Sequence, residues 1–111
     1  MATALPPRPH GDVSGTWAAI GRLEGYRGGL RMINTSLGTL MSGASGLDGL
    51  FLIGLTGYRV GAMAEVDVVI AGVDSAIVQL RAGVRRLEHD LRTWQAACDR
   101  IRAANAAAAR P

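Results

Sequence analysis

The sequence predicts an all-α protein, a long antiparallel two-helix hairpin with a heptad seam that is completed by oligomerisation. The first observation is that apolar residues recur at alternating spacings of three and four in both halves of the chain. The second is a pair of glycines near the middle that suits a reversal. The third is the length of 111 residues, 49% hydrophobic and 19% charged, which gives one domain with a thin core. A second chain would supply the missing core.

The N-terminal segment, residues 1–13, is expected to be a disordered lead-in. It holds three of the four prolines and lacks the charged-then-apolar order of a signal peptide. If the protein leaves its cell, it therefore does so by a route that needs no such peptide. The alternatives for localisation are the cytoplasm, export by such a route, or association with a particle.

The first helix is expected over about residues 16–52, beginning after Ser14 or Thr16, whose hydroxyl can cap free amides. Its length would be roughly 50 Å at 1.5 Å per residue. The apolar residues that predict its seam are Leu23, Tyr26, Leu30, Ile33, Leu37, Leu40, Ala44, Leu47 and Phe51.

The turn is expected at residues 53–58, with Gly54, Leu55, Thr56 and Gly57 as the reversal, because two glycines can adopt positive φ. The second helix would follow over about 59–106, with 107–111 as a tail. A loop this short makes the helices antiparallel and brings Trp17 level with about Trp94. The seam of the second helix is predicted from Val66, Ile70, Val73, Ile77, Leu80, Val84, Leu87, Leu91, Trp94, Cys98 and Ile101.

The face of the first helix that points away from the seam consists of small and mostly uncharged residues. This glycine stripe comprises Gly21, Gly25, Gly28, Met32, Thr35, Thr39, Ser42, Gly46 and Gly49. Each glycine costs roughly 1 kcal/mol of helix propensity relative to alanine, so the stripe needs a tertiary or quaternary reason.

Three interpretations of the stripe remain open. The first helix can be flexible and poorly formed, or the stripe can be buried against a second subunit or partner helix. The third is insertion of the hairpin tip into a membrane through Leu50, Phe51 and Leu52. That apolar run is far shorter than the ~20 residues a span requires, so membrane contact is expected only at the tip.

Catalytic and ligand-binding constellations are missing, so no enzyme, cofactor or metal site is predicted. His10 and His89 have no nucleophile or base at a meaningful spacing, and Cys98 falls at a seam position as a small buried hydrophobe. The glycines match neither a phosphate loop nor a dinucleotide fingerprint. Acidic residues interrupt the partly aligned arginines of the second helix, which argues against nucleic-acid binding.

An Arg- and Ala-rich helical hairpin of this length without a signal peptide resembles the small WXG-type substrates of type VII secretion, over about residues 14–108. The family's Trp-X-Gly reversal corresponds to Leu55-Thr56-Gly57, with leucine in place of tryptophan. Its export signal, Tyr followed four residues later by an acid, is replaced by Trp94 and Asp99, one position longer. The resemblance implies pairing with itself or a similar hairpin and recognition by a secretion ATPase.

The leading hypothesis is a non-catalytic helical interaction protein that forms a homo- or heterodimer through the glycine stripe and the apolar tip, in its most concrete form a type VII-like substrate or helper. One alternative is a structural subunit of a large assembly such as a phage virion, packed between neighbouring subunits. Another is a membrane-active hairpin that uses the tip.

Overall fold

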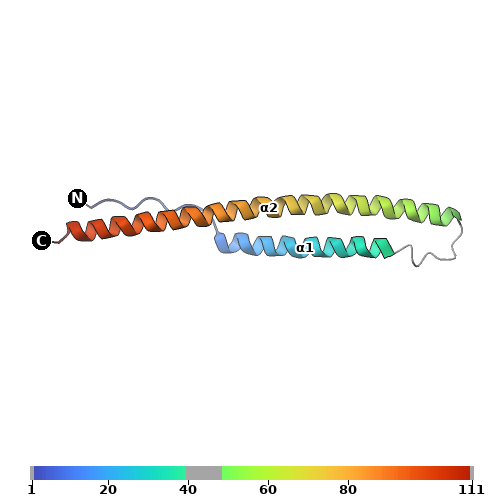
Figure 1. The fold of residues 1–111 in the computed structure, drawn as a ribbon, viewed down its shortest axis with the longest axis horizontal. Coiled ribbons are helices and arrows are strands. Elements are labelled where there is room, and N and C mark those ends of the chain that lie inside the picture. Colours follow the sequence, from blue (N-terminus) through green and yellow to red (C-terminus); the bar gives the residue numbers. More distant parts are fainter. Residues whose placement is uncertain (1, 40–48, 111) are drawn as a thin grey trace.

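The computed structural model describes residues 2–39 and 49–110 and shows two long helices, α1 (Val13–Thr39) and α2 (Gly49–Ala108). The helices account for 87% of the described residues, with no strand among them. They run antiparallel in a rod of 95 × 16 × 13 Å (Figure 1). The predicted helical hairpin is confirmed.

Helix α1 begins earlier than expected, because Asp12 caps it. The Asp12 side chain accepts a hydrogen bond from the Gly15 amide at 2.9 Å, and its carbonyl accepts one from the Thr16 amide at 3.0 Å. An aspartate in this position satisfies amides that have no partner within the helix. The expected start near residue 16 is therefore wrong by about one turn.

The seam of α2 lies where the apolar spacing predicts it. Ile77, Val84 and Cys98 are fully buried there, and Ile20 is the one buried residue of α1. Ile20 packs with Ile77 and Val84, and the surrounding residues are half-buried: Val13, Leu23, Val73 and Leu80. The heptad spacing of α2 is thus sufficient to locate the core.

The seam of α1 differs from the prediction at two positions. Tyr26 and Ile33 are exposed, and the neighbouring Arg27 and Asn34 face α2 instead. Val13, Ile20, Arg27 and Asn34 follow one another at intervals of seven residues, so the two polar residues occupy the same heptad position as Ile20. Arg27 Nη1 donates to Asp74 at 2.8 Å, and Asn34 Nδ2 donates to Asp67 at 2.6 Å.

The predicted turn at residues 53–58 is wrong, because α2 already begins at Gly49. Gly54, Leu55, Thr56 and Gly57 are all helical, and neither glycine has a positive φ. A helical glycine costs only about 1 kcal/mol relative to alanine, too little to end a helix whose inward-facing positions continue on both sides. The first helix likewise ends at Thr39 rather than near residue 52, and α2 extends to Ala108 rather than 106.

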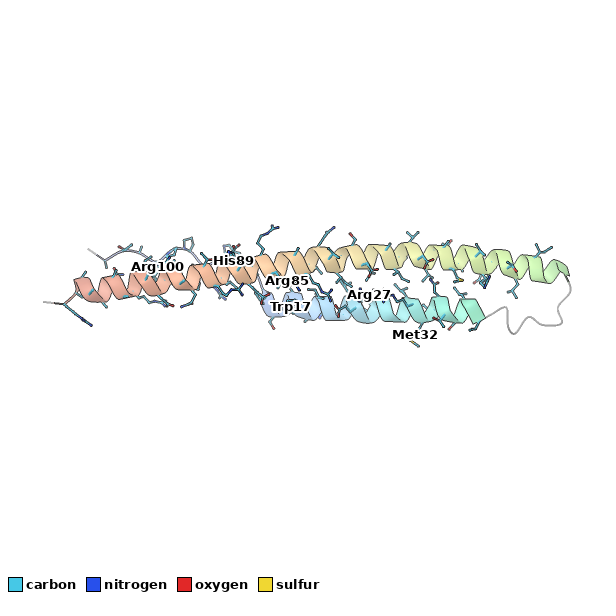
Figure 2. The ribbon with its side chains drawn as sticks, viewed as in Figure 1. Trp17, Arg27, Met32, Arg85, His89 and Arg100 are labelled. Carbon is cyan, nitrogen blue, oxygen red and sulfur yellow. The ribbon has the colours of Figure 1, made fainter. Side chains whose placement is uncertain are left out.

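The register of the hairpin shifts as a result. Three polar contacts join the helices: Glu24 to Arg81, Arg27 to Asp74, and Asn34 to Asp67. In this register Trp17 lies at the level of Arg85 along the rod rather than at the level of Trp94 (Figure 2). The C-terminal part of α2 therefore projects beyond the start of α1 (Figure 1).

The segment before α1 is not a disordered lead-in but lies along the projecting part of α2. The Trp94 indole donates to the Pro6 carbonyl at 2.9 Å, and the Arg8 guanidinium lies 5.9 Å from the centre of the same ring. Thr3 and Asn105 exchange two hydrogen bonds, of 2.9 and 3.0 Å. We call residues 2–12 the N-terminal strap, since they cover the seam of α2 where α1 does not reach.

Gly11 allows the strap to join α1. Its φ of 146° lies in the range that favours glycine, and a Cβ there would overlap the Leu87 side chain. The proline-rich composition predicted an irregular segment correctly. It gave no sign of the surface that holds the segment in place, because the partners lie about ninety residues away in sequence.

Candidate interaction surfaces

The part of the glycine stripe that lies on α1 faces away from α2. Met32, 72% exposed, points outward from the hairpin (Figure 2). The exposed members on α1 are Gly21, Gly25, Gly28, Met32, Thr35 and Thr39. A Cβ added at any of these glycines would meet no atom within 4 Å. This outer face of α1 is open to a partner.

The remaining members do not continue the stripe on the same helix. Ser42 and Gly46 lie outside the described residues, and Gly49 is the first residue of α2. The expectation of one continuous face from Gly21 to Gly49 is therefore wrong. It depended on a first helix that reached residue 52.

The apolar run lies in the first turn of α2, at the end of the rod opposite the chain termini (Figure 1). The side chains of Leu50, Phe51 and Leu52 are outside the described set, whereas Ile53 is 72% exposed. Within the described chain, no helix is both long and apolar enough to cross a membrane. At the tip, Ile53 thus presents apolar surface to the solvent.

One side of the hairpin is closed by polar contacts. This polar flank consists of the Glu24–Arg81 and Arg27–Asp74 ion pairs and the Asn34–Asp67 hydrogen bond. Glu24 and Arg81 occupy equivalent heptad positions, which face each other in an antiparallel pair. These contacts therefore fix both the register and the side on which the pairs lie.

On the opposite side, the six described positions beside the seam carry no charge, and the nearest charge within this length is Arg22 at their border. We call this side the apolar flank, and it comprises Ala19, Tyr26 and Ile33 on α1 and Val69, Ala76 and Gly83 on α2. The register of the polar flank places Tyr26 across from Ala76, and Ile33 across from Val69. Tyr26, Ile33 and Val69 are exposed, and a Cβ at Gly83 would meet no atom within 4 Å.

The sequence prediction missed the apolar flank because it assigned Tyr26 and Ile33 to the seam. A signal was present: on α2, the heptad position of Val69, Ala76 and Gly83 carries no charge over three repeats. Recognising it as half of a continuous face requires the register between the helices. That register depends on the boundaries of a turn that the sequence placed wrongly.

The residues considered for chemistry are scattered. His10 and His89 are exposed, and Cys98 is buried in the seam of α2. Among the described residues there is no group of three histidines, cysteines or carboxylates that could hold a metal ion, and no pocket.

No family model, curated protein or solved structure matches the chain. The resemblance to WXG-type proteins accordingly depends on the architecture and on the residues themselves. The three residues aligned with the Trp-X-Gly reversal, Leu55 to Gly57, lie inside α2 and not in a turn. They give the resemblance no structural support.

Proposed function

We propose that the chain is a non-catalytic helical assembly protein that pairs with itself or with a similar hairpin. The observation that carries the proposal is the imbalance between buried and exposed apolar side chains. Only Ile20, Ile77, Val84 and Cys98 are buried among the described residues. Many large apolar side chains remain exposed on both helices: Tyr26, Met32, Ile33, Val60, Val68, Val69 and Val78.

The architecture explains this imbalance. A two-helix hairpin buries a single narrow seam, and each helix needs further neighbours to cover a wider apolar face. Burial of apolar surface contributes about 25 cal/mol per Å², so covering several of these side chains would supply several kcal/mol. A chain of this size gains that burial most directly through a second subunit.

A narrower form of the proposal is a type VII-like secreted substrate or helper. The elongated helical hairpin and the alanine-rich end of α2 support it, and a secretion ATPase would then be a partner. The test is co-expression with such a secretion system and detection of the intact protein outside the cell. Retention in cells with an active system would reject this form and leave the assembly role untouched.

The alternative function is that of a structural subunit in a larger particle. The exposed apolar residues at the tip of the rod favour this alternative. At the tip, Ile53 and Tyr58 are exposed on a part of α2 that extends beyond the end of α1 (Figure 1). Contacts through both the tip and the sides would build an open-ended assembly rather than a closed dimer.

The experiment is multi-angle light scattering on the purified chain over a wide concentration range. A defined dimer supports the leading proposal, and a large or growing species supports the structural subunit. A folded monomer at all concentrations would reject both. Flotation with liposomes tests membrane contact at the tip, and absence of the chain from the floating fraction would reject that role.

A further inference from the structure

We infer that the apolar flank binds a second copy of this chain, turned end over end about a two-fold axis that passes at the level of Ala76 and Tyr26. This inference depends on the proposed self-association and specifies its face and geometry. Two observations carry it: the sizes of the residues along the flank and the charges that border it.

The side-chain sizes along α2 are arranged about Ala76 so that a large residue on one side matches a small residue on the other. Val69 and Gly83 lie one heptad on either side of it in α2. When α2 packs antiparallel on α2 of the second copy, Val69 of each chain therefore meets Gly83 of the other. The space beside Gly83 is unfilled in the single chain, which leaves room for the valine methyl groups.

The same relation holds on α1. Ile33 and Ala19 lie one heptad on either side of Tyr26, so the isoleucine of each chain faces the alanine of the other. Tyr26 falls at the axis, where it meets its own symmetry mate. Apart from Tyr26 at the axis, the large residue of each pair thus faces a small one on both helices, which favours close packing.

Two of the three charges at the border of the apolar flank, Glu65 and Arg86, are also self-complementary. The third, Arg22, lies one turn from both Ala19 and Tyr26 and stays at the solvent-exposed edge. Glu65 precedes Val69 by one helical turn and Arg86 follows Gly83 by one turn, so both lie at the edge of the apolar flank. Both are exposed and have no ion-pair partner within the described residues. The point halfway between Glu65 and Arg86 along α2 lies at the level of Ala76. The same axis therefore brings Glu65 of each chain opposite Arg86 of the other.

This charge pairing selects one orientation. If the second copy instead ran in the same direction, Glu65 would face Ser36 of the other chain, and Arg86 would face Gly15. Arg86 would then approach the Asp12 carboxylate, which lies against Gly15, but Glu65 would meet no cation. The end-over-end arrangement pairs both charges and makes the interface isologous, as a closed dimer needs.

The second copy lies on a different surface from the one that the sequence predicts. The glycine stripe belongs to the outer face of α1, and the apolar flank lies between that face and α2. Both surfaces can be occupied at once, so the outer face stays available to a further partner.

Charge reversal and rescue test the inference. We expect Glu65→Arg and Arg86→Glu each to weaken the dimer by about 10-fold or more, since each places two like-charge pairs in the interface. The double variant should return the dissociation constant to within about threefold of the wild type. Within one chain these residues are about 31 Å apart along α2, so the rescue cannot be intramolecular.

Arg85→Glu is the control matched to Arg86→Glu. It makes the same charge change one position along α2, outside the border of the apolar flank. It should leave the dimer unchanged, and combined with Glu65→Arg it should give no rescue. Circular dichroism on each variant reports the helix content. A wild-type dimer that the reversals do not weaken, or that the double variant does not restore, overturns the inference while self-association stands. A wild-type monomer overturns both.

Discussion

The two flanks of the hairpin carry opposite chemistry over the same length. The polar flank joins α1 to α2 through Arg27–Asp74, Glu24–Arg81 and Asn34–Asp67. The apolar flank exposes Tyr26, Ile33 and Val69, and its charged residues lie only at the border. The difference teaches that the ion pairs specify the register of the single chain, whereas the opposite side makes no such contact and is the surface that we propose for a second copy.

The largest effect is expected from an acid on the apolar flank. Val69→Asp would place two carboxylates in the dimer without partners, and we expect the dissociation constant to rise by at least about 100-fold. Analytical ultracentrifugation measures it. Val68→Asp is the control one residue away, where the side chain is 73% exposed, against 51% for Val69. Equal effects of the two variants would remove the distinction between the flank and the rest of α2.

On the polar flank the expected effect is on folding rather than on pairing. Asp74→Ala leaves the half-buried Arg27 guanidinium without its partner, and we expect the free energy of unfolding to fall by about 1 to 2 kcal/mol. Urea denaturation followed by circular dichroism measures this change. The dissociation constant of the folded variant should stay within about threefold of the wild type.

The control for that variant is Asp99→Ala, which removes an exposed ion pair with Arg102 at 3.8 Å and an exposed hydrogen bond from Gln95. It should cost less than about 0.5 kcal/mol. If Asp74→Ala costs no more than this control, the polar flank does not hold the register.

Two glycine variants compare the apolar flank with the outer face of α1. Gly83→Ala and Gly25→Ala each raise helix propensity by up to about 1 kcal/mol at an exposed position. We expect Gly83→Ala to weaken the dimer several-fold, because the added methyl group fills the space that Val69 of the second copy needs. Gly25→Ala should leave it unchanged in the same sedimentation assay. The reverse result would place the second copy on the glycine stripe.

The smallest effect concerns the N-terminal strap. Trp94→Phe removes the indole donor that holds the Pro6 carbonyl, and we expect a loss of about 0.5 to 1 kcal/mol. Faster proteolysis within residues 2–12, with α2 still intact, would report release of the strap. Trp17→Phe is the control, since Trp17 lies outside the strap contact. Equal proteolysis rates in the two variants would show that the indole does not secure the strap.

The sequence was sufficient for the parts of the fold that depend on local periodicity. The spacing of Ile77, Val84 and Cys98 located the seam of α2, because successive heptad positions share one face of a helix. The same spacing failed on α1, where Tyr26 and Ile33 are more apolar than Arg27 and Asn34 yet lie outside the seam. Polar residues can occupy a seam when a facing carboxylate compensates them, and a single-helix pattern does not reveal such a partner.

The candidate site could not be predicted because it depends on long-range register. The pair Gly54 and Gly57 gave a strong local turn signal that the surrounding helix overrode. With the turn misplaced, the predicted pairing moved Trp17 from the level of Arg85 to that of Trp94. The residues of the apolar flank then did not meet, although each was visible in the sequence.

The most direct test of the central claim is cross-linking of Ala76→Cys. The residue is half-buried at the proposed axis, so the two introduced thiols should lie within disulfide distance. We predict that mild oxidation converts this variant to a covalent dimer on a non-reducing gel, while Ala82→Cys on the exposed face of α2 and the wild type, with its buried Cys98, stay uncross-linked. A wild-type dimer in which Ala76→Cys remains unlinked, or links no faster than Ala82→Cys, would contradict the account.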